Sequence, residues 1–336
     1  MKGTVEVQSF ESQALKGNPL SDPATRRVVV YLPAAHSTGK ESFPVAYFLH
    51  GFGSGVDKWL AQANSWGLTV PERLDQLIES GKVPPFIGVF VDGWTALGGA
   101  QWMNSEATGR YSDYLARDVV SWVDQHYRTV KASAGRALIG HSSGGYGAMV
   151  NGRDHHDIFG HIACHAGDSA FEYAYLGDFW RAAGPLLQSG GLDKWFPDFV
   201  QRARETKMKG DDFSVINTVA MAAAYSPKKG APLNLELPFD QETARLRQDV
   251  WAKWLENDPV RFIPKHLASF KKLRSIFLDA GSRDEFGLRW GTRMMAEELK
   301  KGGVDFLHEE FDDGHRDTSY RYDRSVLYLV PRMTRS

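Results

Sequence analysis

The chain has 336 residues, of which 42% are hydrophobic and 12% aromatic, and its 40 basic and 41 acidic side chains give a formal net charge of -1. This composition supports a buried core and excludes a largely disordered chain, and the length suits one large domain or two ordinary ones. The balanced charge gives no reason to expect nucleic acid as a partner, and no run approaches the roughly 18 apolar residues of a membrane span.

The N-terminal residues 1–7 lack the apolar stretch of a signal peptide. We therefore expect a cytoplasmic protein, with export as the alternative if a leader has been removed. Cys164 is the one cysteine, which excludes an internal disulfide. It lies in an apolar run with the pattern of a strand end, so we interpret it as a buried structural thiol and not as a nucleophile.

Short apolar runs along the chain have the pattern of strands that are buried on both faces. These runs are 27–32, 45–49, 86–91, 136–140, 275–279 and 305–309. Helical patterns lie between them at 71–80, 112–127, 145–153 and 287–301. Strands that alternate with helices predict an α/β fold with a mostly parallel central sheet flanked by helices.

The stretch 168–267 interrupts this alternation and is rich in Trp and Phe. We predict a helical insertion there, so that 1–167 forms the first part of the α/β core and 268–336 the second. Its aromatic side chains can form a helical layer packed on itself, the walls of a cap over a pocket, or both. On the second interpretation, Trp180 and Trp195 are candidate substrate contacts.

The run Gly140-His141-Ser142-Ser143-Gly144 fits the pattern Gly-x-Ser-x-Gly. An apolar strand leads into it and a helix-compatible segment leads out, so the serine is expected at a sharp turn that exposes its hydroxyl. The glycine spacing selects Ser142 as the nucleophile over Ser143. The alternative is an ordinary turn rich in glycine and serine.

A serine hydroxyl needs a base to take its proton and a carboxylate to orient that base. His315 follows the last predicted strand and is the candidate base, with His308, inside that strand, as the alternative. Asp279, Asp284 and Glu285 compete for the orienting role after the preceding strand. We favour Asp284, because Asp279 is expected to belong to the strand itself, although a helix cap is another role for Asp284.

An oxyanion hole needs backbone N–H groups aimed at the tetrahedral oxygen. One is expected from Ser143, the residue after the nucleophile. The other is expected from Phe52, with Gly51 as the next choice, in the glycine-rich loop 50–55 that follows the run 45–49.

Together these motifs resemble the Putative esterase family of α/β-hydrolases, which includes feruloyl esterases, S-formylglutathione hydrolases, enterochelin esterases and mycolyltransferases. The similarity covers 28–168 and 273–315, and its most specific parts are 114–118, 140–148 and 156–160. The resemblance also favours Asp284, because the segment 281–284 matches the acid loop of the family. The insertion departs from the smallest family members, so the resemblance does not supply the substrate pocket.

The resemblance implies a serine esterase that hydrolyses a small-molecule carboxylic ester through an acyl-enzyme. The alternatives are an acyltransferase that uses an alcohol other than water and a non-catalytic binding protein on the same fold. No cofactor is expected, because neither a Gly-x-Gly-x-x-Gly motif nor a P-loop is present. The histidines near 155–165 match no metal-binding spacing, so no metal is expected either.

Two further residues are candidate substrate contacts. Trp102 and Asn104 follow the predicted strand 86–91 and are expected near the edge of the sheet where sites gather. A purely structural role is the alternative for both. Oligomeric state is not determined by these patterns, and a homodimer is one candidate.

Overall fold

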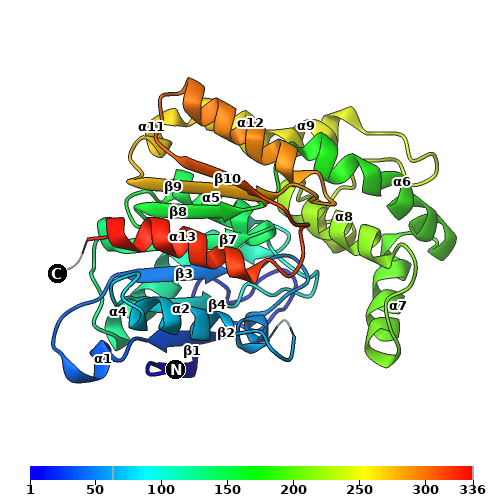
Figure 1. Cartoon of the computed structure of the whole chain (residues 1–336). Coiled ribbons are helices and arrows are strands. Elements are labelled where there is room, and N and C mark those ends of the chain that lie inside the picture. The colour runs from blue at the N-terminus through cyan, green and yellow to red at the C-terminus, as the bar shows by residue number, and fades with distance from the viewer. Residues whose placement is uncertain (63, 335–336) are drawn as a thin grey trace.

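The computed structural model describes residues 1–62 and 64–334. Its centre is an eight-stranded sheet in the order β1-β2-β4-β3-β7-β8-β9-β10 (Figure 1). β2 pairs antiparallel with β1 and with β4, and every other neighbouring pair is parallel. The strands are β1 (Thr4–Glu11), β2 (Thr25–Leu32), β3 (Val45–Leu49), β4 (Ile87–Val91), β7 (Arg136–His141), β8 (His161–His165), β9 (Ser275–Gly281) and β10 (Leu307–Phe311), while β5 (Asn104–Ser105) and β6 (Gly109–Arg110) form a separate small hairpin.

The predicted α/β architecture with a mostly parallel sheet is confirmed. Each predicted strand is present with its ends within a few residues of the expected ones, and the largest shift is that of β10, which runs from Leu307 to Phe311 and not over 305–309. β1 was missed, because it is an edge strand whose side chains are mostly exposed or half-buried. Such a strand lacks the continuous apolar run that marks the buried strands.

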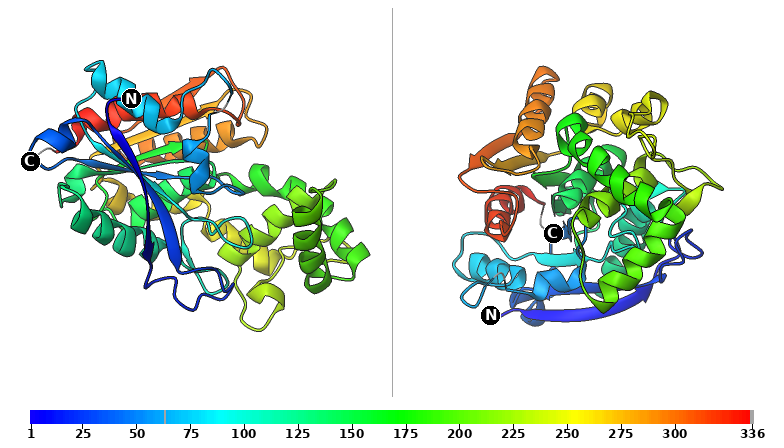
Figure 2. Two further views of the ribbon diagram at one scale, coloured as in Figure 1. Left: turned by 90° about the horizontal axis from the view of Figure 1, so that it is seen from below. Right: turned by 90° about the vertical axis from the view of Figure 1, so that its right-hand side faces the viewer.

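The central strands supply side chains to two separate cores, because successive residues of a strand point to opposite faces. On β3, Val45, Tyr47 and Leu49 join one buried cluster, whereas Ala46 and Phe48 join the other. α4, α5 and α12 cover the first face, and α2 and α13 cover the second (Figures 1 and 2). Both faces of the sheet are therefore buried from solvent, which explains why the central strands are apolar throughout.

The helices of the core are α1 (Ala35–Thr38), α2 (Val70–Glu79), α3 (Tyr111–Asp113), α4 (Val120–His126), α5 (Ser143–Asp154), α12 (Leu288–Lys301) and α13 (Tyr322–Leu329). A π-helical segment, Tyr114–Val119, joins α3 to α4. The start of α2 is set locally by a capping box: Thr69 Oγ1 accepts from the Glu72 N–H, and the Glu72 carboxylate accepts from the Thr69 N–H at 2.8 Å.

Between β8 and β9 the chain forms α6 (Phe171–Ser189), α7 (Leu192–Glu205), α8 (Asp212–Tyr225), α9 (Gln248–Glu256), α10 (Pro259–Phe262) and α11 (Leu267–Phe270). α6, α7 and α8 project beyond one end of the sheet (Figure 1). Aromatic rings pack on each other inside this layer; Phe179, for example, lies 5.4 Å from Trp254 between ring centroids. None of the helices in residues 1–62 and 64–334 has the length and apolar character needed to cross a bilayer.

A substitution of Phe48 tests the core on the face of the sheet that α2 and α13 cover. The Phe48 ring stacks on Phe90 at 4.8 Å and meets Tyr322 edge-on at 5.8 Å, and it is fully buried. We expect Phe48→Ala to lower the free energy of unfolding by about 3–5 kcal/mol, because it removes this packing and leaves a cavity. Urea unfolding followed by circular dichroism measures the change. Val7→Ala, at a side chain on β1 that is 49% exposed, is the control and should stay within about 0.5 kcal/mol. Equal effects of the two substitutions would contradict this account of the core.

Candidate active site

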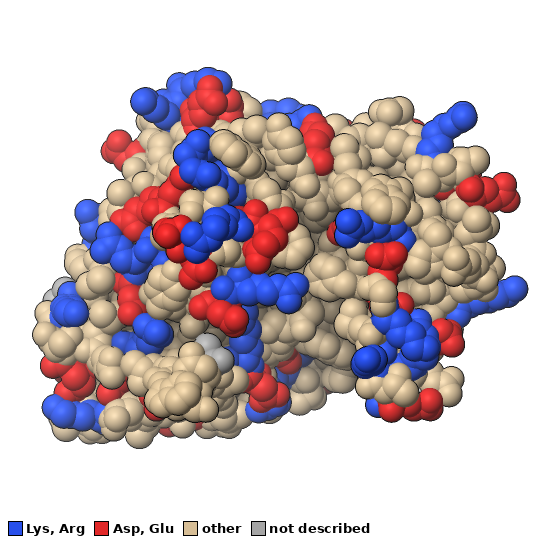
Figure 3. All heavy atoms as spheres, turned by 45° about the vertical axis from the view of Figure 1, so that its right-hand side comes forward, with Lys and Arg blue, Asp and Glu red and all other residues tan. Residues whose placement is uncertain are grey.

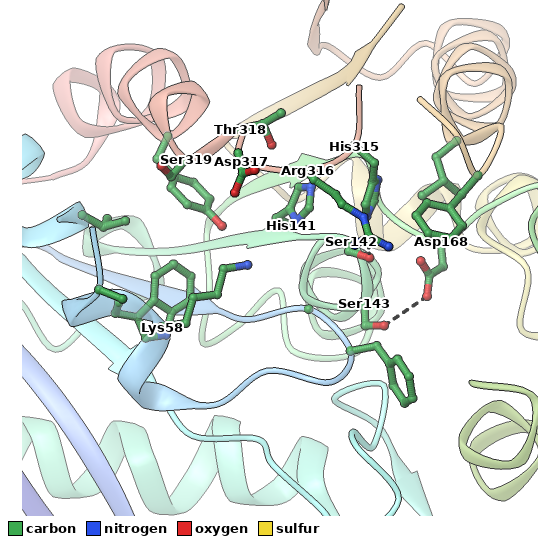
Figure 4. Close-up of a pocket in the computed structure, with 18 of the residues that line it drawn as sticks. Lys58, His141, Ser142, Ser143, Asp168, His315, Arg316, Asp317, Thr318 and Ser319 are labelled. Carbon is green, nitrogen blue, oxygen red and sulfur yellow. Dashed lines mark hydrogen bonds between the residues drawn. The ribbon is translucent and has the colours of Figure 1, made fainter. Parts of the chain in front are cut away.

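The candidate site lies where the parallel strands end. The loops that follow β3, β7, β8, β9 and β10 leave the sheet at its carboxyl edge, which is where open α/β sheets bind ligands. Ser142, Ser143, Asp168 and His315 come from the connections that follow β7, β8 and β10, and they surround one cavity (Figure 4). Residues far apart in the sequence therefore meet because their strands are neighbours.

Ser142 joins β7 to α5 in a strained conformation. Its φ of 58° and ψ of -128° lie in a region that residues with a Cβ rarely adopt. The turn is held by two backbone hydrogen bonds of 2.9 Å, one from the Ser142 N–H to the His165 carbonyl and one from the Tyr146 N–H to the Ser142 carbonyl. This conformation lifts the serine side chain out of the sheet and into the cavity.

The turn at Ser142 depends on two glycines that allow close backbone contact. A Cβ on Gly144 would lie 2.0 Å from the Leu49 carbonyl oxygen, and a Cβ on Gly140 would lie 2.0 Å from the Gly144 carbonyl oxygen. These positions therefore accept only glycine without rearrangement of the backbone. The glycines of the Gly-x-Ser-x-Gly pattern thus have a steric reason in this structure.

The structure brings the three predicted triad residues together. His315 Nε2 lies 3.0 Å from Ser142 Oγ, and His315 Nδ1 lies 2.7 Å from Asp284 Oδ2. The Glu285 carboxylate accepts the backbone N–H of His315 at 2.7 Å and so fixes the loop. A carboxylate facing Nδ1 favours the tautomer with the proton on that nitrogen, which leaves Nε2 free to accept the serine proton.

Asp284 also contacts the start of α12, the helix whose capping was the alternative role for it, although the N-cap residue of that helix is Gly287. Its Oδ1 accepts the backbone N–H groups of Phe286 at 3.0 Å and Leu288 at 3.2 Å, at the start of α12. The two interpretations of this residue are compatible, because each carboxylate oxygen has its own set of donors.

The competing residues Asp279 and His308 lie elsewhere. Asp279 is buried on β9, next to the edge strand β10, and its two oxygens lie 2.6 Å from His165 Nδ1 and 2.8 Å from Arg321 Nε. His308 stays on β10, and its Nε2 has no partner among the described residues. Neither side chain reaches Ser142.

Two backbone N–H groups beside Ser142 are available to a bound ligand. Within the described part of the chain, neither Phe52 N–H nor Ser143 N–H donates to any acceptor. Ser143 is the first residue of α5, where the N–H groups are free and the helix dipole favours negative charge. The loop of Phe52 passes close by, since a Cβ on Gly51 would lie 3.1 Å from the Ser142 Cβ.

The cavity beside Ser142 has a volume of about 590 Å³, within the range of small-molecule sites. Its walls combine core residues with residues of the insertion. The apolar lining includes Phe52, Trp59, Val70, Phe213 and Phe286. The aromatic insertion therefore contributes to the cavity as well as packing on itself.

His141 lines the cavity with its ring centroid 4.5 Å from that of His315. Burial, together with the neighbouring His315, holds the pKa of His141 well below its ordinary value. His141 is therefore neutral at pH 7. An imidazolium formed on His315 does not face a second positive ring.

Trp102 and Asn104, predicted as substrate contacts, do not line the cavity. Trp102 is buried in the core and donates its indole N–H to the His50 carbonyl at 3.1 Å. Asn104 Oδ1 accepts two backbone N–H groups at the start of α3. Both side chains are therefore engaged in hydrogen bonds with the backbone of the protein.

Trp180 and Trp195, predicted from the aromatic insertion, are also outside the cavity. Trp180 is 64% exposed on the surface of α6. Trp195 is buried on α7, and its ring centroid lies 4.8 Å from that of Phe199 on the same helix.

The sequence analysis instead missed Asp168, Tyr175 and Phe213, which do line the cavity. The available signal was the position of Asp168 shortly after β8, at the edge where the other site residues lie.

Cys164 lies buried on β8, and burial raises the pKa of its thiol to about 12. It is therefore a poor nucleophile.

Among the described residues, no group of three or more His, Cys, Asp or Glu side chains is arranged to hold a metal ion. Basic and acidic residues are interspersed on the face shown in Figure 3, which offers no continuous basic surface.

The family model described as Putative esterase matches residues 23–321 of this chain. An esterase of Mycobacterium tuberculosis is 25% identical over 189 residues, which are 54% of this chain and 37% of that protein. An endo-1,4-beta-xylanase/feruloyl esterase of Xylanibacter ruminicola is 31% identical over 120 residues, which are 34% of this chain and 16% of that protein. The matches thus span well under half the length of these curated relatives.

Solved structures share the fold at low sequence identity. A ferulic acid esterase superposes with a TM-score of 0.64 at 17% identity and covers 98% of this chain and 99% of its own. An S-formylglutathione hydrolase from Agrobacterium tumefaciens has a TM-score of 0.56 at 15% identity, covering 99% of this chain and 96% of its own. A fluorophosphonate-binding serine hydrolase of Staphylococcus aureus has a TM-score of 0.59 at 14% identity, covering 98% and 97%.

Gly144 tests the close backbone contact under the serine turn. We expect Gly144→Ala to lower the free energy of unfolding by about 1–3 kcal/mol, because the new methyl group overlaps the Leu49 carbonyl. Gly177→Ala is the matched control: a methyl group added at Gly177 on α6 would meet no neighbouring atom within 4 Å, so helix propensity should leave stability unchanged or raise it by up to about 1 kcal/mol. Chemical unfolding of both variants provides the comparison. A Gly144→Ala protein as stable as the wild type would contradict the steric argument.

Proposed function

The chain belongs to the Putative esterase family, and from that premise we propose that it is a serine carboxylic-ester hydrolase that acts through an acyl-enzyme on Ser142. The observation that carries the proposal is the hydrogen-bonded series from Ser142 to His315 to Asp284, with distances of 3.0 and 2.7 Å, at the wall of a cavity. The substrate is a small-molecule ester. No cofactor takes part in the proposed reaction.

In the first step, His315 Nε2 takes the proton of the Ser142 hydroxyl as the oxygen attacks the ester carbonyl carbon. Asp284 stabilises the imidazolium that forms. The negative charge on the carbonyl oxygen is received by the N–H groups of Phe52 and Ser143. Collapse of the tetrahedral intermediate transfers the proton from His315 to the leaving alcohol and leaves the acyl group on Ser142.

In the second step, the same imidazole activates a water molecule that attacks the acyl-enzyme. The second tetrahedral intermediate uses the same N–H donors and releases the carboxylic acid and Ser142. Transfer of the acyl group to another alcohol would follow the same route with that alcohol in place of water. Product analysis with and without added alcohols separates the two reactions.

Ser142→Ala removes the proposed nucleophile. We expect turnover of p-nitrophenyl esters, from acetate to long chains, and of methyl ferulate to fall by roughly 10⁴- to 10⁶-fold, and labelling by a fluorophosphonate to disappear. Ser189→Ala, at the end of α6 and outside the cavity, is the control that should retain both properties. Wild-type protein that takes no label and cleaves no ester, or a Ser142→Ala protein that keeps its activity, would refute the proposal.

Asp284→Asn tests the orienting carboxylate. We expect turnover to fall by about 10³- to 10⁴-fold, because an amide favours the wrong tautomer of His315. Asp279→Asn is the informative comparison: it disrupts the buried pair with Arg321 and should lower the unfolding midpoint while the folded enzyme keeps its triad. Steady-state kinetics and thermal unfolding of both variants distinguish catalysis from stability. The reverse pattern would assign the orienting role to Asp279.

A further inference from the structure

Asp168 is a carboxylate in the same cavity that the proposed reaction does not use. It follows β8, lines the cavity with Ser142, and is only 8% exposed. In Figure 4 it lies beside Ser142 and His315, joined to the Ser143 side chain by a hydrogen bond.

The two oxygens of Asp168 are in different situations. Oδ2 accepts three hydrogen bonds, from Gln101 Nε2 at 2.7 Å, from the Tyr175 hydroxyl at 3.0 Å and from the Ser143 hydroxyl at 3.2 Å. Oδ1 accepts none from the residues that the structure describes. It is also not one of the buried atoms that lack a partner, so it remains accessible from the cavity. The carboxylate is thus held by one oxygen and open at the other.

Asp168 has no ion-pair partner among the described residues, and the titratable side chain whose charge acts on it is that of His315. No Lys or Arg among residues 1–62 and 64–334 lies within ion-pair distance of it, and its hydrogen-bond donors are all neutral. Burial raises the pKa of Asp168, whereas the donors to Oδ2 and the charge of His315 act in the opposite direction. A buried carboxylate without a cation is costly to maintain, and a ligand that donates to Oδ1 would offset that cost.

The three groups that donate to Oδ2 do not require a charge on Asp168. The Ser143 and Tyr175 hydroxyls and the Gln101 amide need only one acceptor oxygen, which an amide would also supply. The hydrogen bonds within the protein therefore account for Oδ2 of Asp168 but give no role to Oδ1.

We propose that Asp168 is a substrate-binding residue that selects esters carrying a hydrogen-bond donor, either an aliphatic hydroxyl or an ammonium group, through its open oxygen in the cavity. This inference rests on the proposed esterase function of the same site. A site built to accept a hydrogen bond discriminates strongly against an isostere without the donor, because the acceptor is then buried and unpaired.

The test uses esters that differ only in one terminal group. The acyl series consists of the p-nitrophenyl esters of butanoate, 3-hydroxypropanoate and 3-aminopropanoate, which end in methyl, hydroxyl and ammonium. The alcohol series consists of butan-1-yl acetate and the monoacetate of propane-1,3-diol, which end in methyl and hydroxyl. Their hydrolysis is followed by pH-stat titration. We expect kcat/KM for a donor ester to exceed that of its methyl isostere by roughly 10- to 100-fold in at least one series.

The variant is Asp168→Asn, in which the amide oxygen can receive the three internal donors and the NH₂ group then faces the cavity. We expect the ratio of kcat/KM between donor and methyl esters to fall to within about threefold of one, mainly through KM. Asp198→Asn, at an exposed carboxylate on α7, is the control and should keep the wild-type ratio.

Three results would overturn the inference: no preference for donor esters in the wild type, a preference that survives in Asp168→Asn, or an equal loss of kcat on every ester in Asp168→Asn. The last result would make Asp168 a positioning residue for Ser143. Fluorophosphonate labelling distinguishes these from failure of the esterase proposal itself, because in that case the wild type would take no label and cleave neither methyl nor donor esters.

Discussion

The close approach of α5 to the end of β3 is the constraint on which the site depends. β3 and β7 are parallel neighbours, with Leu49 opposite Gly140, so the loops that follow them leave the sheet side by side. Gly144 allows the first turn of α5 to rest against the Leu49 carbonyl, and Ser142 takes its strained conformation between them. The same approach sets the free N–H of Ser143 near the loop of Phe52. The proposed nucleophile and the proposed oxyanion donors are thus positioned by one backbone contact.

Three carboxylates near the carboxyl edge of the sheet differ in role because they differ in partners. Asp279 is neutralised by Arg321 and therefore belongs to the stability of the sheet. Asp284 faces His315 with one oxygen and the start of α12 with the other. Asp168 has only neutral donors and one open oxygen. Position along the chain does not separate these roles, whereas the pairing of each oxygen does.

The helices between β8 and β9 both pack on each other and line part of the cavity. Most of the aromatic rings of this insertion pack within the helical layer, as Phe179 and Trp254 illustrate, and this layer is continuous with the core on one face of the sheet. A few of its residues, such as Tyr175 and Phe213, reach the cavity. The α/β core therefore supplies the groups that are proposed to react, and the insertion supplies part of the cavity wall. Changes in the insertion can alter the wall without disturbing the strand ends.

The amino-acid sequence alone determined the α/β fold and the serine turn and predicted His315, because these depend on local patterns: continuous apolar strands, glycines at fixed spacing, and a polar residue directly after a strand. The prediction of Asp284 over its acidic neighbours also needed the resemblance to the esterase family. It did not determine which side chains line the cavity. Trp102 was selected because it follows a strand, and Trp180 and Trp195 because the insertion is aromatic, but in the fold Trp102 and Trp195 are buried and Trp180 is exposed. Asp168 was found only in the tertiary structure, because its significance lies in partners, Gln101 and Tyr175, that the fold brings together around it.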